Sequence, residues 1–116
     1  AFGGEILSAA GGWRVRWTPD PPVIPLDALF SVDLLVAPAS PETASIPPAD
    51  VEVAIDARMP HHRHGMLVRP TVRRIGPDRF RCEGLMLHMP GYWELHVDLV
   101  TGGSVERAQA SFEIDG

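Results

Sequence analysis

The sequence predicts an all-β fold, a single immunoglobulin-like β-sandwich of about seven antiparallel strands. Apolar and polar residues alternate with a period of two in one segment after another, which is typical of half-buried strands. The chain contains 11 glycines and 12 prolines, so turns are expected at short intervals. No segment has a convincing helical period. A small β-barrel is the alternative that the same pattern allows.

The first predicted strand shows the pattern most clearly, because Trp13, Val15 and Trp17 alternate with arginines. Strands with the same alternation follow along the chain, and Gly76-Pro77-Asp78 forms a turn between two of them. The predicted strands are residues 13–17, 30–36, 51–57, 66–75, 79–89, 92–100 and 108–114.

The connections between these strands contain most of the prolines. Residues 19–25 form a proline-broken connection, and residues 38–49 are expected to be a Pro-rich loop. The sequence has no internal repeat, and no change in composition along the chain indicates a second domain. Residues 1–116 are therefore predicted to form one β-sandwich domain.

Gly84 determines which way the side chains after it face. The alternation before this glycine and the apolar set after it have opposite phases, and a one-residue slip such as a β-bulge reconciles them. With the slip, Met86 and His88 face outward and Met89 faces inward. Without it, Met89 faces outward and His88 is buried.

Composition excludes several classes of function. The formal charge is −5 and the ten basic residues, all arginines, are scattered, so no basic face for nucleic acid is expected. The single cysteine, Cys82, excludes an internal disulfide and is expected to be a buried, unreactive thiol. The chain has no apolar run of about 18 residues that could span a membrane. The nucleophile, zinc and phosphate-binding motifs of common enzymes are also missing, so we expect no enzymatic activity.

The histidines and methionines are concentrated in one part of the chain. All five histidines and all four methionines fall between Met59 and His96. Imidazole and thioether together favour copper over harder metals, as Cu(I) with mixed ligands or Cu(II) with three imidazoles. The predicted ligands are His62, His64 and His88, with Met66 or Met86 as a weaker thioether and His61, Met59 and Met89 as additional candidates. The competing expectations are a solvated histidine loop and methionines that only fill the core.

Strand order predicts that these ligands meet. Antiparallel connections place loop 58–65 and turn 88–91 at the same end of the sandwich. If residues 66–75 and 79–89 pair as a hairpin, His64 or Met66 lies opposite His88 or Met89, with Cβ atoms about 4.5–5.5 Å apart. His96 lies farther down its strand and is expected on the surface.

A set of motifs between Ala57 and Leu95 carries a family resemblance. They are Met59-Pro60, His62-x-His64-Gly65-Met66, Pro70, Phe80, Gly84-Leu85 and Met89-Pro90-Gly91-x-Trp93-Glu94-Leu95. This stretch resembles the YtkA-like domain family, which includes FixH-like proteins. The resemblance implies an immunoglobulin-like sandwich that is exported or membrane-tethered in bacteria, with copper handling or cytochrome oxidase assembly in some members.

The chain departs from these families at several positions. His61, Arg63 and His88 are additions to the YtkA-like pattern. In its choice of histidine and methionine the chain also resembles periplasmic copper chaperones. Their motif ends in histidine-x-methionine, whereas this chain has His88-Met89, which counts against membership of the chaperone family.

Two functions are therefore expected. The first is a copper-binding protein of the periplasm or another extracytoplasmic part of the bacterial envelope, a metallochaperone that holds or transfers one copper ion. It would have a protein partner in the envelope and no nucleic-acid partner, and a membrane tether outside the given chain is compatible with it. The alternative is a non-metal interaction module that docks on a membrane complex for oxidase or transport assembly.

Overall fold

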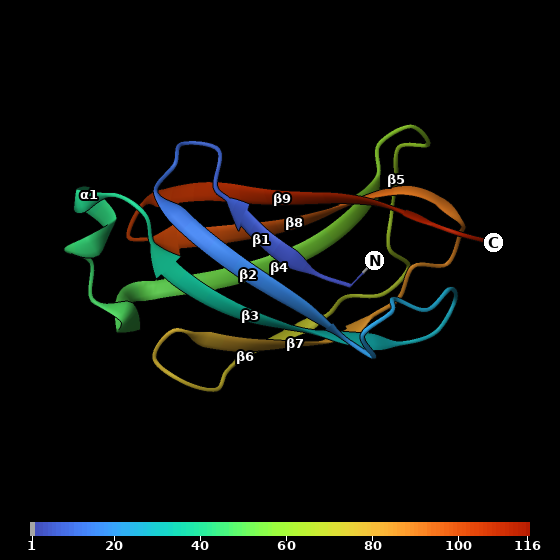
Figure 1. Ribbon diagram of the computed structural model, residues 1–116, viewed down its shortest axis with the longest axis horizontal. Coiled ribbons are helices and arrows are strands. Elements are labelled where there is room, and N and C mark those ends of the chain that lie inside the picture. Colours follow the sequence, from blue (N-terminus) through green and yellow to red (C-terminus); the bar gives the residue numbers. More distant parts are fainter. Residues whose placement is uncertain (1) are drawn as a thin grey trace.

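Two antiparallel sheets pack face to face in the computed structural model, which describes residues 2–116 (Figure 1). Sheet A has the order β1-β2-β3-β7-β6, and sheet B has the order β5-β4-β8-β9. The predicted all-β sandwich is confirmed, and β1 and β5 are short strands in addition to those expected. The strands are β1 (Gly4–Leu7), β2 (Trp13–Asp20), β3 (Phe30–Pro38), β4 (Val51–Met59), β5 (His64–Gly65), β6 (Thr71–Arg74), β7 (Arg79–Leu85), β8 (Gly91–Thr101) and β9 (Ser104–Ile114).

The core lies between the sheets and follows the alternation of the sequence. In β2, Trp13, Val15 and Trp17 are buried, while the arginines between them are exposed. The central strand of sheet B, β8, contributes Trp93 and Val97, which are both fully buried. Removal of these large apolar surfaces from water is the main force that holds the two sheets together.

The Pro-rich segment 38–49 contains a one-turn helix, α1 (Pro41–Ala44), followed by the 3-10 turn η1 (Pro48–Asp50). Ser40 caps α1, because its hydroxyl accepts a 3.3 Å hydrogen bond from the Thr43 amide. One turn is too short to show a helical period in the sequence. Within residues 2–116 there is no helix that is long and apolar enough to cross a membrane.

The hairpin predicted for residues 66–75 and 79–89 is shorter than expected. Strand β6 pairs with β7 only as far as Thr71 opposite Glu83. His64 instead pairs with Met59 of β4, in the other sheet. The expectation that His64 or Met66 faces His88 or Met89 across a hairpin is therefore wrong. Pro70 lacks the amide proton that a longer ladder needs.

The predicted phase slip at Gly84 is confirmed. Phe30 pairs with Leu85 and Val32 with Cys82, so three residues of β7 span two of β3. Gly84 has a φ of +84°, a conformation that glycine adopts without strain. Leu85 and Leu87 consequently point into the core and have no exposed surface. The residues at the even-numbered positions 86 and 88 face outward and are half-buried.

Two crossover segments lie at one end of the long axis. Residues 66–70 lead from sheet B to sheet A, and residues 86–90 lead back from sheet A to sheet B. We call this end, with residues 60–66 and 86–90, the histidine end. Figure 1 shows it opposite the end that carries α1.

Candidate metal site

Three of the predicted ligands lie beside one another at the histidine end. The ring centroids of His64 and His88 are 6.5 Å apart, with ring planes inclined by 21°. The ring centroid of His62 lies 6.1 Å from that of His64, and these two rings are nearly perpendicular at 78°. The rings of His64 and His88 are therefore neighbours, and their proximity arises from the two crossovers and not from a hairpin.

His88 is held firmly from both sides. The amide of Asp27 donates a 2.8 Å hydrogen bond to the carbonyl of Leu87. The indole Nε1 of Trp93 donates to the carbonyl of Met89 at 2.9 Å. The buried Trp93 ring also meets the His88 ring edge-on, with centroids 5.8 Å apart. The alternation of β8 predicts the burial of Trp93, but the sequence carries no signal for this contact with His88.

One nitrogen of His88 has no protein partner. Among the described residues, Nδ1 of His88 is buried and forms no hydrogen bond. Buried polar atoms are paired in nearly all native structures, because an unpaired one costs about 1–3 kcal/mol. This atom is therefore the strongest indication within residues 2–116 that the histidine end receives a ligand.

The distances between the rings are close to those of a shared ion. A metal–nitrogen bond of about 2.0 Å places the ion about 3.2 Å from the ring centroid, so two imidazoles on one ion lie at most about 6.4 Å apart. The 6.1 Å pair is inside this limit and the 6.5 Å pair is just beyond it. Accordingly, residues 2–116 contain no group of three or more His, Cys, Asp or Glu already placed to hold a metal. Three imidazoles on one ion, about 120° apart, would have ring centroids about 5.5 Å apart, so the two pairs must approach by about 0.6 and about 1.0 Å and turn their nitrogens toward the ion to form a shared site.

The loop that carries His62 can supply this shift. His62 and His64 are exposed, and Arg63 between them has a φ of +54°. The turn is held by long backbone hydrogen bonds, 3.2 Å from the His62 amide to Met59 and 3.4 Å from the Arg63 amide to Pro60. The site thus combines the anchored imidazole of His88 with that of His62, on an adjustable turn, and that of His64, on the two-residue strand β5.

His61 and His96 lie outside this group. The ring of His61 stacks on Tyr92 with centroids 5.0 Å apart. His96 is only 8% exposed, and its Nε2 lies 3.1 Å from Glu94 Oε1, so the expectation of a surface histidine is wrong. The reason is its place on the central strand β8, where it lies between Asp56 of β4 and Gln109 of β9.

The methionines divide between the core and the site. Met59, an additional candidate ligand, has no exposed surface and lies against Gly91, where an added Cβ would be 3.0 Å from its Cε, so it packs as a core residue. Met66 and Met89 are partly buried and pack against the core. Met86 is half-buried and lies outside the core cluster, two residues before His88. Met86 is therefore the methionine that neither belongs to the core cluster nor packs against it.

The thiol of Cys82 is unsuited to metal binding. It is fully buried in sheet A. Burial, with a smaller contribution from the negative charge of Asp33, raises its pKa to about 12. The thiolate that a metal would need is therefore not formed near neutral pH, as the sequence predicted.

Comparison with known proteins supports the fold and no finer assignment. No protein-family model matches the chain, so no family match supports the resemblance to YtkA-like proteins. No curated protein matches it either. Among solved structures, the chain is similar to a DUF4426 family protein from Pseudomonas aeruginosa, with a TM-score of 0.57 and 10% identity over 96% of this chain and 94% of the other. At this identity the similarity concerns the fold alone: the chain is a small β-sandwich domain like that protein.

Proposed function

We propose that this protein binds one copper ion at its histidine end, through His62, His64 and His88. The observation that carries the proposal is the buried, unpaired Nδ1 of His88, whose ring centroid lies 6.5 Å from that of His64. A neutral imidazole nitrogen without a hydrogen-bond partner, with a second imidazole nearby, is a suitable ligand for a late first-row metal ion. A bound ion would remove the cost of the unpaired nitrogen.

Copper is favoured over other metals by the donors that surround the site. Met86, two residues before His88 in the sequence, carries a thioether, which binds soft ions such as Cu(I) and is a poor ligand for Mg²⁺, Ca²⁺ or Mn²⁺. The carboxylate of Glu94, which a hard ion would prefer, is occupied by the ring nitrogen of His96 and the hydroxyl of Tyr92. Imidazoles alone would also accept Cu(II), so both oxidation states fit the donor set.

The exposure of the loop suggests transfer as well as storage. His62 and His64 reach solvent, whereas His88 is anchored beside Trp93. A partner protein can therefore approach the ion from the loop side and exchange ligands one at a time. Together with the YtkA-like motifs, this supports the role of a metallochaperone in the periplasm or another extracytoplasmic part of the bacterial envelope. Its partner would be a copper-receiving protein of that compartment.

Competition with a Cu(I) chelator tests the proposal. Purified protein is titrated with Cu(I) under bicinchoninate, next to the His62→Ala, His64→Ala and His88→Ala variants. Each substitution should weaken binding, with the largest loss for His88→Ala because it removes the fixed imidazole. His61→Ala and His96→Ala are matched controls, since both histidines lie outside the group of three rings. Equal affinity in all five variants and the wild type would contradict the proposal.

A second function is favoured by the apolar surface beside the same end. Val23, Leu26 and Leu29 are exposed on the loop between β2 and β3. This loop is joined to the crossover by the hydrogen bond between Asp27 and Leu87. Exposed apolar patches are typical of docking sites, so a non-metal interaction module that docks on a membrane complex is the competing proposal. It predicts that partner binding survives His88→Ala and is lost in Leu26→Asp/Leu29→Asp.

A further inference from the structure

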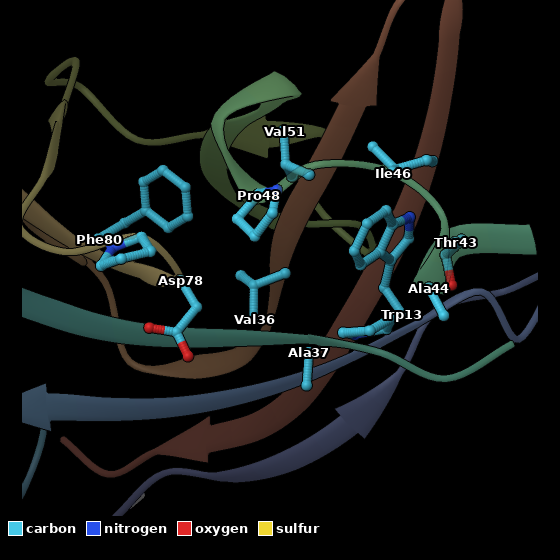
Figure 2. Close-up of a pocket in the computed structure, with 12 residues that line it drawn as sticks. Trp13, Val36, Ala37, Thr43, Ala44, Ile46, Pro48, Val51, Asp78 and Phe80 are labelled. Atoms are coloured by element: carbon cyan, nitrogen blue, oxygen red, sulfur yellow. The ribbon is translucent and has the colours of Figure 1, made fainter. Parts of the chain in front are cut away.

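An apolar cavity lies at the α1 end, far from the histidines. Its volume is about 230 Å³. Figure 2 shows Phe80 at one end of the lining and Trp13 and Ile46 at the other, with Val36, Pro48 and Val51 between them. The cavity is partly open to solvent and is not occupied by any side chain of the core.

The segment that covers the cavity is fixed in place. Thr43 of α1 donates a 2.6 Å hydrogen bond to the carbonyl of Gly12, which also accepts from the Ala39 amide at 2.8 Å. At the other end, the guanidinium of Arg74 donates to the carbonyls of Pro48 and Val51. A cavity that exists before its ligand arrives requires little ordering on binding, which favours affinity.

The walls define the chemistry of the ligand. The carboxylate of Asp78, at the edge of the cavity, points away from the other side chains in Figure 2. The guanidinium of Arg74 lies 4.6 Å over the ring of Phe80, and its donors are engaged by backbone carbonyls. No charged group in the lining is therefore directed at the interior, and a charged ligand would lose its hydration without gaining an ion pair.

We propose that this cavity is a binding site for a small, uncharged aromatic molecule of about two fused rings. A cavity of about 150 Å³ with apolar walls accepts benzene, so the 230 Å³ here suits a bicyclic ring. Trp13 and Phe80 contribute aromatic walls to the cavity, and few polar groups in the lining remain to be satisfied. The site is independent of copper binding, because it lies at the opposite end of the sandwich.

Two naphthalene probes test the proposal in ¹H–¹⁵N correlation spectra. We expect 2-naphthol to cause saturable shifts of the Trp13 indole N–H and of amides around the cavity, with a dissociation constant below about 1 mM. The anion 2-naphthoate should bind at least ten-fold more weakly. An absence of saturable shifts, shifts confined to the histidine end, or equal binding of the two probes would overturn the proposal.

Variants on one strand locate the binding. Val36→Phe fills the cavity and should abolish the shifts, whereas Leu35→Phe adds the same ring to the outer face of the same strand and should leave binding unchanged. Ala44→Phe fills the cavity from the exposed cap and serves if Val36→Phe fails to fold by circular dichroism. Binding that persists in the folded filling variant, or is lost equally in Leu35→Phe, would contradict the assigned site.

Discussion

The imidazole of His64 lies nearly parallel to that of His88, with 6.5 Å between the ring centroids. His64 is part of the short strand β5 at the edge of sheet B, and His88 belongs to the crossover that returns from sheet A. Their proximity is therefore a property of the whole sandwich and not of one local motif. It depends on the bulge at Gly84 and on the anchors that hold the second crossover.

Gly84→Ala should weaken both the fold and the copper site. A residue with a Cβ at φ +84° is strained, and the expected loss is about 1–2 kcal/mol in the free energy of unfolding. The space is open, since the nearest atom to the new Cβ is 3.9 Å away, so the cost comes from the backbone. Relief of the strain would shift the bulge and turn His88, which should lower the Cu(I) affinity measured by chelator competition.

Gly102→Ala is the control for this prediction. It has a φ of +57°, open space around its Cβ and a position in the turn between β8 and β9. It should cost a similar free energy of unfolding and leave Cu(I) affinity unchanged. A Gly84→Ala variant that binds copper as tightly as the wild type would show that the bulge does not position His88.

Trp93→Phe should loosen His88 without removing a ligand. The substitution deletes the hydrogen bond from the indole to the carbonyl of Met89, which contributes about 1 kcal/mol, and keeps an aromatic ring in the core. We expect a several-fold loss of copper affinity in a chelator titration. Trp17→Phe, in a stacked pair with Phe112 in the other part of the core, should destabilise the protein without this loss. The same affinity loss in both variants would indicate a general effect of stability.

Substitution of single methionines should distinguish a methionine that packs in the core from one that binds copper. Met59→Leu conserves volume in a fully buried position, so it should cost less than about 1.5 kcal/mol and leave copper binding unchanged. Met86→Leu should lower the affinity for Cu(I) more than that for Cu(II), because the soft thioether prefers the reduced ion. Parallel titrations of both ions check this. If Met59→Leu weakens Cu(I) binding and Met86→Leu does not, the assignment of the two residues is wrong.

The buried thiol of Cys82 should make the protein sensitive to alkali. Burial and the charge of Asp33 raise its folded-state pKa to about 12, while an unfolded cysteine titrates near about 8.5. Below the unfolded pKa the thiol is neutral in both states. As the pH rises through the window between these values, only the unfolded state loses the proton, and stability falls by up to about 1.4 kcal/mol per pH unit.

Urea unfolding at pH 9 and pH 10.5 measures this effect. The wild type should lose about 2 kcal/mol more than Cys82→Ala over this interval. An equal decrease in the two proteins would show that the thiol ionises readily in the fold.

The sequence was sufficient to predict the sandwich because the core alternates with a period of two. It also predicted the slip at Gly84, since the phases before and after this glycine disagree. It could not predict that residues 66–70 cross between the sheets, because a short extended segment has the same pattern whether or not it is paired. The burial of His96 depends on neighbours from β4 and β9, which no local pattern reveals. The hydrogen bond of Trp93 to Met89 likewise requires the folded turn.

A crystal structure of the protein loaded with one equivalent of copper, with anomalous differences collected at the copper edge, tests the central claim most directly. The account predicts a single strong peak about 2.0 Å from ring nitrogens of His64 and His88, with His62 as the next ligand. A peak beside His61 or His96, or no peak at full copper loading in solution, would contradict it.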